Sequence, residues 1–323
     1  MGNNTDVETT YLRFSGHSGT CSNGFSGFLD GLFTKIQDTF FFVFVLQFGL
    51  VSLMYYNIGR GKYWKILFWA SLANFYGAIV ENSTVAFICR ESVKDKEYKW
   101  VFPFLLAEIG WIIGEYSIPI LNLTKMKTFS EGIFEKIVYY LIMGLFLPLF
   151  IACRLFIGYN RMKYGVLTTT ETKYGHAAAF SIMAISDVTC TIAILYFVRK
   201  NNSQEEITHY IKKTSYTILL CVDVVGILLA VANGISEYFD CIPGSTVNPF
   251  HCIKCSVILI LAVDALLFKY NHTMNTIHEP TTDDDDDNNG NVSNTNYTCS
   301  LTLRTNNYVI DSSDFNIHAT ARI

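Results

Sequence analysis

The sequence predicts an all-α membrane protein, in which a seven-helix transmembrane bundle is followed by a disordered polar C-terminal tail. Half of its 323 residues are apolar and only 16% are charged, whereas a soluble domain carries roughly a quarter charged residues. Seven stretches of mostly apolar residues are about 20 residues long, which is enough to cross roughly 30 Å of hydrocarbon. Lys and Arg gather in short clusters between these stretches, as is typical of a polytopic membrane protein.

Residues 1–39 form the expected extramembrane N-terminal segment. They lack a basic head followed by an apolar core, so no signal peptide is expected. Residues 40–269 hold the predicted membrane domain, whose short connections leave no room for a separate soluble domain. The predicted spans are Phe40–Ile58, Ile66–Cys89, Val101–Leu123, Ile137–Ile157, Ala177–Val198, Ser215–Ile235 and Pro249–Phe268.

The polar tail occupies residues 270–323 and contains the acidic run Asp283–Asp287. It is rich in Asn, Asp, Thr and Ser, so it cannot bury enough apolar surface to offset the entropy of folding, and it is predicted to be disordered. The net charge of −4 owes much to this run. The charge therefore gives no indication of a nucleic-acid partner.

The positive-inside rule favours an outside N-terminus, and hence a plasma-membrane protein with its tail in the cytosol. With that orientation the inner loops carry ten Lys and Arg residues and the outer loops seven. The glycosylation motif at Asn3 favours the same orientation, whereas the motifs at Asn291 and Asn296 favour the opposite one.

The cysteines leave several possibilities open. Cys21, Cys89, Cys241 and Cys252 lie near aqueous segments, where an oxidising compartment allows a disulfide, but the sequence does not determine the pairing. The motif Cys252-x-x-Cys255 has no second pair of ligands at a suitable spacing, so no metal site and no cofactor are expected. No hydrolase, zinc-protease or P-loop motif occurs either, so an enzyme is not expected.

The informative feature is a set of polar and ionisable residues inside the predicted spans. Each charged residue costs about 2.5–3.5 kcal/mol near a helix centre on insertion scales, so it normally faces the bundle interior. On the third span Glu108, Glu115 and Asn122 recur every seven residues and share one face. Arg154 is interpreted as the one basic residue well inside a span. The candidate ligand- or ion-binding residues are Asn74, Glu81, Glu108, Glu115, Arg154, Asp187, Asp223 and Asp264.

Crowded carboxylates of this kind cannot all be ionised in a low-dielectric interior without cations. They predict a polar cavity that binds a cationic or polyhydroxylated ligand, conducts protons or cations, or holds a sodium ion that biases two conformations. The alternative is that each acid bonds a polar side chain across helices and only fixes packing. Arg154 either extends to the outer headgroups or pairs with Glu108 or Glu81.

Seven spans, an outside N-terminus and an inner polar tail resemble the G-protein-coupled receptors in architecture only. The third span ends in Asn122-Leu123-Thr124-Lys125-Met126 rather than D-R-Y, and Asn248-Pro249 stands at the wrong end of the seventh span for N-P-x-x-Y. Microbial rhodopsins are similar around Glu115–Pro119, but Lys269 falls at the water boundary rather than mid-membrane. Seven-helix sugar carriers need Pro-Gln pairs, and none occurs here.

The architecture and the acidic residues together predict a divergent receptor. It would sense an unknown extracellular small ligand or cation and signal to a cytosolic partner such as a G protein, through basic loops near Lys125–Lys136 and Arg199–Lys213. The alternative is a cation- or proton-handling transporter or channel that uses the same carboxylates.

Overall fold

The computed structural model describes residues 12–14, 20–21, 24–37, 39–59, 61–96, 98–129, 132–200, 206–238, 248–278, 304–305 and 308–309. Within these residues the chain is almost entirely helical, which confirms the predicted all-α class. The helices are η1 (Leu12–Phe14), α2 (Phe28–Ile36), α3 (Thr39–Ile58), α4 (Lys62–Ile88), η2 (Glu91–Val93), α5 (Pro103–Phe129), α6 (Ile133–Tyr140), the π-helical segment η3 (Leu141–Phe146), α7 (Leu147–Tyr164), α8 (Thr170–Lys200), α9 (Glu206–Tyr238) and α10 (Asn248–His278).

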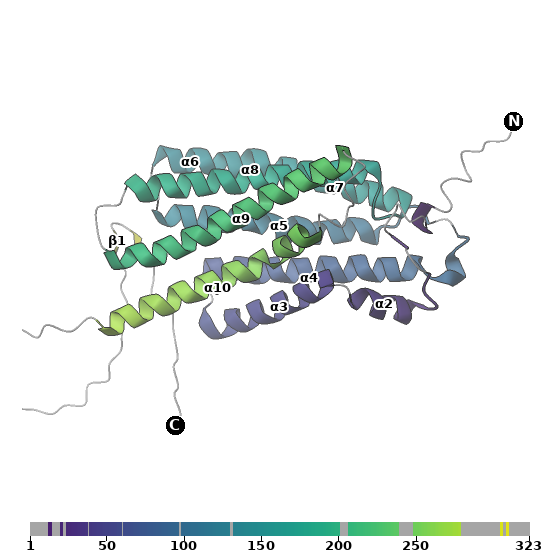
Figure 1. Cartoon of the computed structure of the whole chain (residues 1–323), viewed down its shortest axis with the longest axis horizontal. Helices are drawn as coiled ribbons and strands as arrows, with labels where there is room; N and C mark the ends of the chain where they lie inside the picture. The colour runs from purple at the N-terminus through teal and green to yellow at the C-terminus, as the bar shows by residue number, and fades with distance from the viewer. Residues whose placement is uncertain are drawn as a thin grey trace, which may run out of the picture.

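The long helices lie side by side in one bundle (Figure 1). In chain order each packs against the next: α3 on α4, α4 on α5, α5 on α7, α7 on α8, α8 on α9, α9 on α10, and α10 back on α3. The bundle is therefore a closed ring of helices, and α5 also contacts α8 across it. This central position of α5 explains why most of its face from Glu115 to Leu123 is buried.

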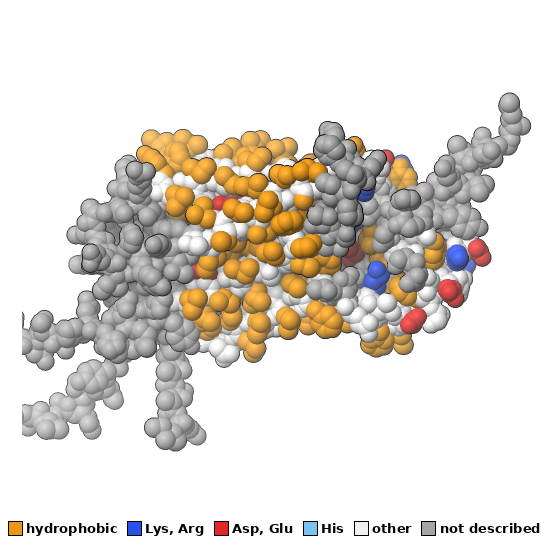
Figure 2. Space-filling view, viewed as in Figure 1, with side chains coloured by type: hydrophobic (Ala, Val, Ile, Leu, Met, Phe, Trp, Pro, Cys, Tyr) orange, Lys and Arg blue, Asp and Glu red, His pale blue; other side chains and the backbone are white. Residues whose placement is uncertain are grey.

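Five helical segments are long and apolar enough to cross a membrane: Phe40–Ile58, Pro103–Lys127, Ile133–Tyr164, Thr170–Phe197 and Pro249–Leu267. Apolar side chains cover most of the middle of the bundle on the face seen in Figure 2, while charged side chains gather at the end beyond α2. Large exposed rings and aliphatic side chains such as Phe42, Trp69 and Ile192 are the surface that a lipid bilayer accepts. These segments support an integral membrane protein.

The two other predicted spans are helical but are not among these five segments. Helix α4 includes Asn74, Glu81 and Asn82, and these polar residues lower its hydropathy. In the part of α9 whose side chains the structure describes, the apolar stretch is Thr217–Ala232. The count of seven spans therefore remains a prediction, although both helices stand in the same ring as the five apolar ones.

Three features differ from the sequence-based description. The N-terminal segment contains a helix, α2, with Phe28, Leu29 and Phe33 exposed on it. Helix α10 continues to His278, past residue 270, where the predicted tail begins. Most of the remaining tail lies outside the described residues, apart from a two-residue pair of antiparallel strands, β1 (Arg304–Thr305) and β2 (Tyr308–Val309).

The fourth predicted span is divided between α6, η3 and α7. Pro148 stands in the first turn of α7 and has no N–H to donate to the carbonyl four residues earlier. The helix widens into the π-helical segment η3 just before this proline, which is how a helix accommodates a missing bond without breaking. The segment Ile133–Tyr164 is therefore helical throughout and long enough to span.

Close packing of α4 on α5 depends on glycines. A Cβ added at Gly110 would lie 2.8 Å from the Ala73 carbonyl oxygen and 3.0 Å from the Gly77 Cα. Both are backbone atoms, which cannot move aside as a flexible side chain can. Small residues at such a crossing let membrane helices approach closely, and this approach brings the polar side chains of the two helices within reach of one another.

The Gly110→Ala variant is expected to unfold more easily by about 1–3 kcal/mol, because the added methyl group forces α4 and α5 apart. Gly49→Ala on α3 is the matched control, since nothing lies within 4 Å of its Cβ position. Thermal unfolding of the purified variants in detergent micelles measures the difference. Equal melting temperatures for the two variants would contradict the close crossing of α4 and α5.

Candidate functional site

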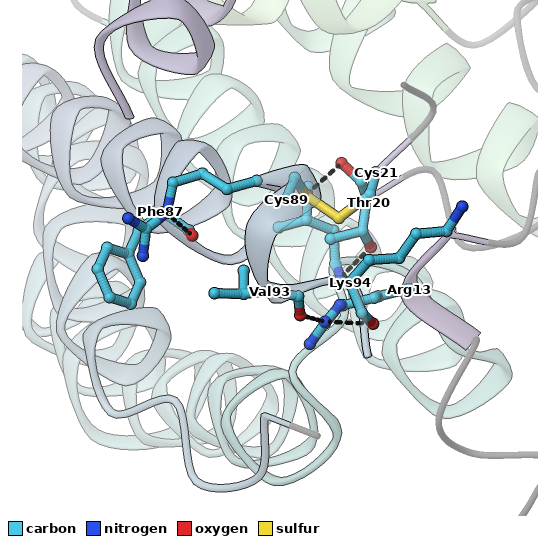
Figure 3. Close-up of a disulfide and its surroundings, with 9 residues drawn as sticks. Arg13, Thr20, Cys21, Phe87, Cys89, Val93 and Lys94 are labelled. Atoms are coloured by element: carbon cyan, nitrogen blue, oxygen red, sulfur yellow. Dashed lines mark hydrogen bonds between the residues drawn. A yellow bond between two sulfur atoms is a disulfide. The ribbon is translucent and has the colours of Figure 1, made fainter. Parts of the chain in front are cut away.

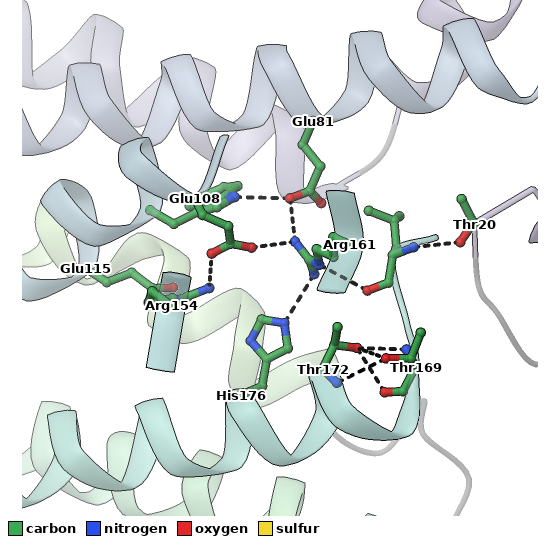
Figure 4. A network of polar contacts seen from close by, with 11 residues as sticks. Thr20, Glu81, Glu108, Glu115, Arg154, Arg161, Thr169, Thr172 and His176 are labelled. Carbon is green, nitrogen blue, oxygen red and sulfur yellow. Dashed lines mark hydrogen bonds and ion pairs between the residues drawn. The ribbon is translucent and has the colours of Figure 1, made fainter. Parts of the chain in front are cut away.

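The structure joins charged residues from four helices into a buried group, the core ion-pair network (Figure 4). Its members are Glu81 on α4, Glu108 and Glu115 on α5, Arg154 and Arg161 on α7, and Lys254 on α10. Three carboxylates and three cations balance, so the network is formally neutral. Neutrality matters because an unpaired charge in a low-dielectric interior is costly.

Arg161 holds the outer part of this network, where α4, α5, α7 and α8 meet. Its Nη1 atom donates to Glu81 Oε2 at 3.0 Å and to Glu108 Oε1 at 2.8 Å. Its Nη2 atom lies 3.1 Å from His176 Nε2 on α8. Trp111 Nε1 donates to Glu81 Oε2 at 3.1 Å, so the carboxylate of Glu81 has a neutral donor as well as a charged one.

Arg154 holds the deeper part. Its Nη1 atom donates to Glu108 Oε2 at 3.1 Å and its Nη2 atom to Glu115 Oε2. Lys254 Nζ donates to Glu115 Oε1 at 2.9 Å. The side chain of Glu108 is 0% exposed and that of Arg154 is 3% exposed, so these ion pairs are shielded from water.

Matched spacing on two helices builds the network. Glu108 and Glu115 are seven residues apart on α5, and Arg154 and Arg161 are seven apart on α7. A spacing of seven is about two helical turns, so each pair lies on one face. Because α5 packs on α7, the two faces meet, and Glu108 bonds both arginines.

The structure corrects the interpretation of the basic residues. Arg154 does not extend to the headgroups, since it is buried and pairs with Glu108 and Glu115 rather than with Glu81. Nor is it the one basic residue inside a span, because Lys254 and Arg161 are also buried. The sequence contains a signal for each of them. Lys254 interrupts an apolar run, and Arg161 stands seven residues after Arg154, which places both arginines on one face of a helix.

The other predicted residues lie in separate groups. Asp264 on α10 accepts from Lys125 Nζ at 2.7 Å. Asn122 Nδ2 on α5 donates to Asp187 Oδ1 on α8 at 3.2 Å, and Asp223 on α9 is buried close by. Asn74 on α4 packs against Gly114 on α5. The eight candidates are therefore distributed along the bundle interior rather than around one cavity.

Arg13, Thr20, Cys21, Phe25 and the segment 89–94 form a cap at the end of the bundle, next to the outer part of the network (Figure 3). A disulfide joins Cys21 to Cys89 at the end of α4, which settles for these two cysteines the pairing that the sequence left open. Arg13 donates to the carbonyl oxygens of Val93 and of Lys94. Phe25 pairs with the backbone on either side of Arg90: its N–H donates to Cys89 at 2.9 Å, and its carbonyl accepts from Glu91 at 2.9 Å.

One residue links this cap to the network. The backbone N–H of Leu167 donates to Thr20 Oγ1 at 2.8 Å, and the backbone carbonyl of Leu167 accepts from Arg161 Nε at 3.0 Å. Thr20 is adjacent to the disulfide-bonded Cys21. A continuous chain of bonds therefore runs from the N-terminal segment through Arg161 to Glu108 and on to Arg154 (Figure 4).

The cysteine motif on α10 does not assemble a metal site. Cys255 Sγ lies 3.3 Å from His251 Nδ1, and within the described residues no three His, Cys, Asp or Glu side chains are placed to hold a metal ion. Cys241 lies outside the described residues.

No known protein family matches this chain, and neither does any curated protein or solved structure. Its function must therefore be argued from its own residues.

The Glu108→Gln variant is expected to lose about 3–5 kcal/mol of unfolding free energy, since it leaves Arg154 and Arg161 short of a buried counter-charge. Glu171→Gln removes the same charge from an exposed site at the start of α8 and is expected to change little. Unfolding in detergent micelles, followed by the loss of helical circular dichroism, measures both variants. Similar small losses would show that the network contributes little to stability.

Proposed function

We propose that this chain is a seven-helix membrane receptor, with the cap outside the cell and the core ion-pair network as the element that transmits the signal. The placement of the cap is supported by its disulfide, because disulfides persist on the oxidising side of a membrane. The five long apolar helices support the membrane setting. Helices α4 and α9 belong to the same ring of packed helices, so they would cross the bilayer beside them.

The observation that carries the proposal is the bonded chain from cap to core. A ligand that moved Thr20 would move Leu167, and with it the guanidinium of Arg161. That guanidinium bonds carboxylates on both α4 and α5. A shift at the outer surface would therefore act first where these helices meet, and hydrogen-bond and ion-pair networks are one means by which two sites are coupled.

The network also contains buried polar atoms that a second arrangement of its side chains could satisfy. Arg154 Nε and His176 Nδ1 are buried without a hydrogen-bond partner in the part of the chain that the structure describes. Buried polar groups are almost always bonded in a stable state, so a repacked state that satisfies them has a source of free energy. Interchange between two pairings of the same charges is a two-state element of the kind that switching proteins use.

The ligand position follows from the ion pairs. Glu81, Glu108 and Glu115 already have cationic partners, so a cationic ligand would have to compete with Arg161, Arg154 or Lys254 for them. We therefore place the unknown small ligand at the cap and outer network. The cytosolic partner, a G protein in this proposal, would contact the opposite end of the bundle, where α5 ends near Lys127.

A transporter or channel for cations or protons is the second candidate. It is favoured by Asp187 and Asp223, which are buried carboxylates outside the core ion-pair network. Ionisable residues inside membrane proteins often mark the path of an ion. Sodium or proton flux in proteoliposomes that disappears in Asp187→Asn would place this function first.

The orientation is tested with an epitope tag after Ile323. On intact cells the antibody is expected not to reach the tag, and it should bind after permeabilisation, because an odd number of spans puts the two termini on opposite sides. A tag accessible on intact cells would place the tail outside and remove the receptor proposal.

The switch is tested with Glu115→Gln, which leaves Arg154 and Lys254 with one carboxylate fewer. We expect basal guanine-nucleotide exchange, in membranes that contain heterotrimeric G proteins, to change by about fivefold or more, a typical coupling between sites. Leu145→Ala is the control, because Leu145 is exposed on the apolar surface. Exchange that is the same in wild type, in both variants and in membranes lacking the chain would overturn the proposal.

A further inference from the structure

Two buried acids lie outside the core ion-pair network and have no cation of their own. Asp187 on α8 and Asp223 on α9 are 4% and 5% exposed. No described Lys, Arg or His forms an ion pair with either of them. Lys254, whose charge acts on Asp187, is bonded to Glu115. Two neighbouring carboxylates in such a setting cannot both be ionised unless a cation balances them.

Two neutral oxygen-bearing side chains accompany these acids. Asn122 on α5 donates its amide N–H to Asp187 Oδ1 at 3.2 Å, which leaves its own carbonyl oxygen beside that carboxylate. Thr191 stands four residues after Asp187, hence on the same face of α8. Its hydroxyl lies close to Asp223 but forms no hydrogen bond of normal geometry. Helices α5, α8 and α9 converge here, since α8 packs on both of the others.

Three of these oxygens make no hydrogen bond of normal geometry, although Thr191 and Asp223 lie close to each other. Asn122 Oδ1, Thr191 Oγ1 and Asp223 Oδ1 are each buried without a hydrogen bond in the described part of the chain, and their residues are 0%, 3% and 5% exposed. Leaving one buried polar atom unsatisfied costs about 1–3 kcal/mol. The contact between Thr191 and Asp223 leaves Asn122 Oδ1 unsatisfied, and a cation between these oxygens would accept lone pairs from all three.

We propose that Asn122, Asp187, Thr191 and Asp223 form a binding site for a sodium-sized monovalent cation. All the available donors are carboxylate, amide and hydroxyl oxygens, which suit hard cations rather than zinc or copper. Calcium takes 6–8 oxygen ligands, whereas these four side chains carry six oxygens, one of which, Asp187 Oδ1, already accepts from Asn122. Sodium sites of this kind occur within helix bundles near the middle of the membrane.

Such an ion would hold α5, α8 and α9 together. Its ligand on α5, Asn122, lies seven residues after Glu115 of the core ion-pair network. It would favour the packing in which the three helices meet and oppose any state that separates them. This inference goes beyond the receptor proposal and does not depend on it, because the site binds its ion whether or not a G protein is the partner.

The test is thermal unfolding of the purified full-length chain in detergent micelles. Sodium chloride is titrated against N-methyl-D-glucamine chloride at constant ionic strength and pH, with potassium chloride in a parallel series. Because an ion that binds only the folded state stabilises it, we expect the melting temperature to rise by several degrees with sodium and to saturate. The rise with potassium should be smaller.

Matched threonine variants separate the site from a general salt effect. Thr191→Val removes the buried hydroxyl while nearly keeping the shape of the side chain, and it should lose at least half of the sodium-dependent rise. Thr189→Val is the control, because that hydroxyl bonds the Ile185 carbonyl on a partly exposed face and should keep the full rise. Asp223→Asn is expected to abolish the rise, even if its melting temperature without sodium is higher.

Three results would overturn the site. One is a wild-type melting temperature that does not depend on sodium. Another is an equal rise with sodium and potassium, and the third is an equal sodium response in Thr191→Val and Thr189→Val. If only the pH dependence of unfolding changes in Asp223→Asn, the two carboxyls share a proton and hold no metal cation. None of these measurements involves a G protein, so failure here is distinct from failure of the receptor proposal.

Discussion

The bonding of Glu108 to two arginines is the interaction on which the interior of this bundle depends. Removing a carboxylate and a guanidinium from water costs several kcal/mol for each ion, and their attraction offsets that cost only when the geometry is good and the remaining lone pairs are bonded. Glu108 meets both conditions, since one oxygen accepts from Arg161 and the other from Arg154. The arginines then extend the pairing to Glu81 on α4 and to Glu115 on α5. Lys254 on α10 also bonds Glu115, so four helices are fixed relative to one another because these charges need partners.

Close packing makes this pairing possible. Short ion pairs across a helix interface need backbones that approach closely, and Gly77 and Gly110 provide that approach between α4 and α5. The carboxylate of Glu81 can then lie near Trp111 and Arg161. Apolar surface could not have driven this association inside a bilayer, because lipid tails are as apolar as Leu. Small residues and buried polar bonds supply the attraction in its place.

Polar groups change character from one end of the bundle to the other. At the cap end the acids are paired with arginines, and the disulfide and the backbone bonds to Leu167 tie them to the N-terminal segment. Farther along α5, near Asn122, the acids on α8 and α9 have no such partners. The first region suits transmission of a mechanical shift, and the second suits the binding of a small cation. The proposed signal-transmitting network and the proposed ion site would therefore share one helix, α5.

The sequence by itself determined the helical class, the positions of the helices and the identity of most interior polar residues. These features depend on local composition: about 20 apolar residues must form a helix in lipid because every backbone group has to be bonded internally, and an acid such as Glu115 within such a stretch faces inward. It did not indicate helix α2 or the extension of α10 past residue 270.

Only the tertiary structure decided which charges meet. Arg154 pairs with Glu115 and not with Glu81, Lys254 reaches α5 from α10, and Cys21 bonds Cys89. Such pairings depend on which helix faces are turned toward one another and on how closely the backbones approach. Both are set by the packing of residues far apart in the chain, so no local pattern in the sequence contains them.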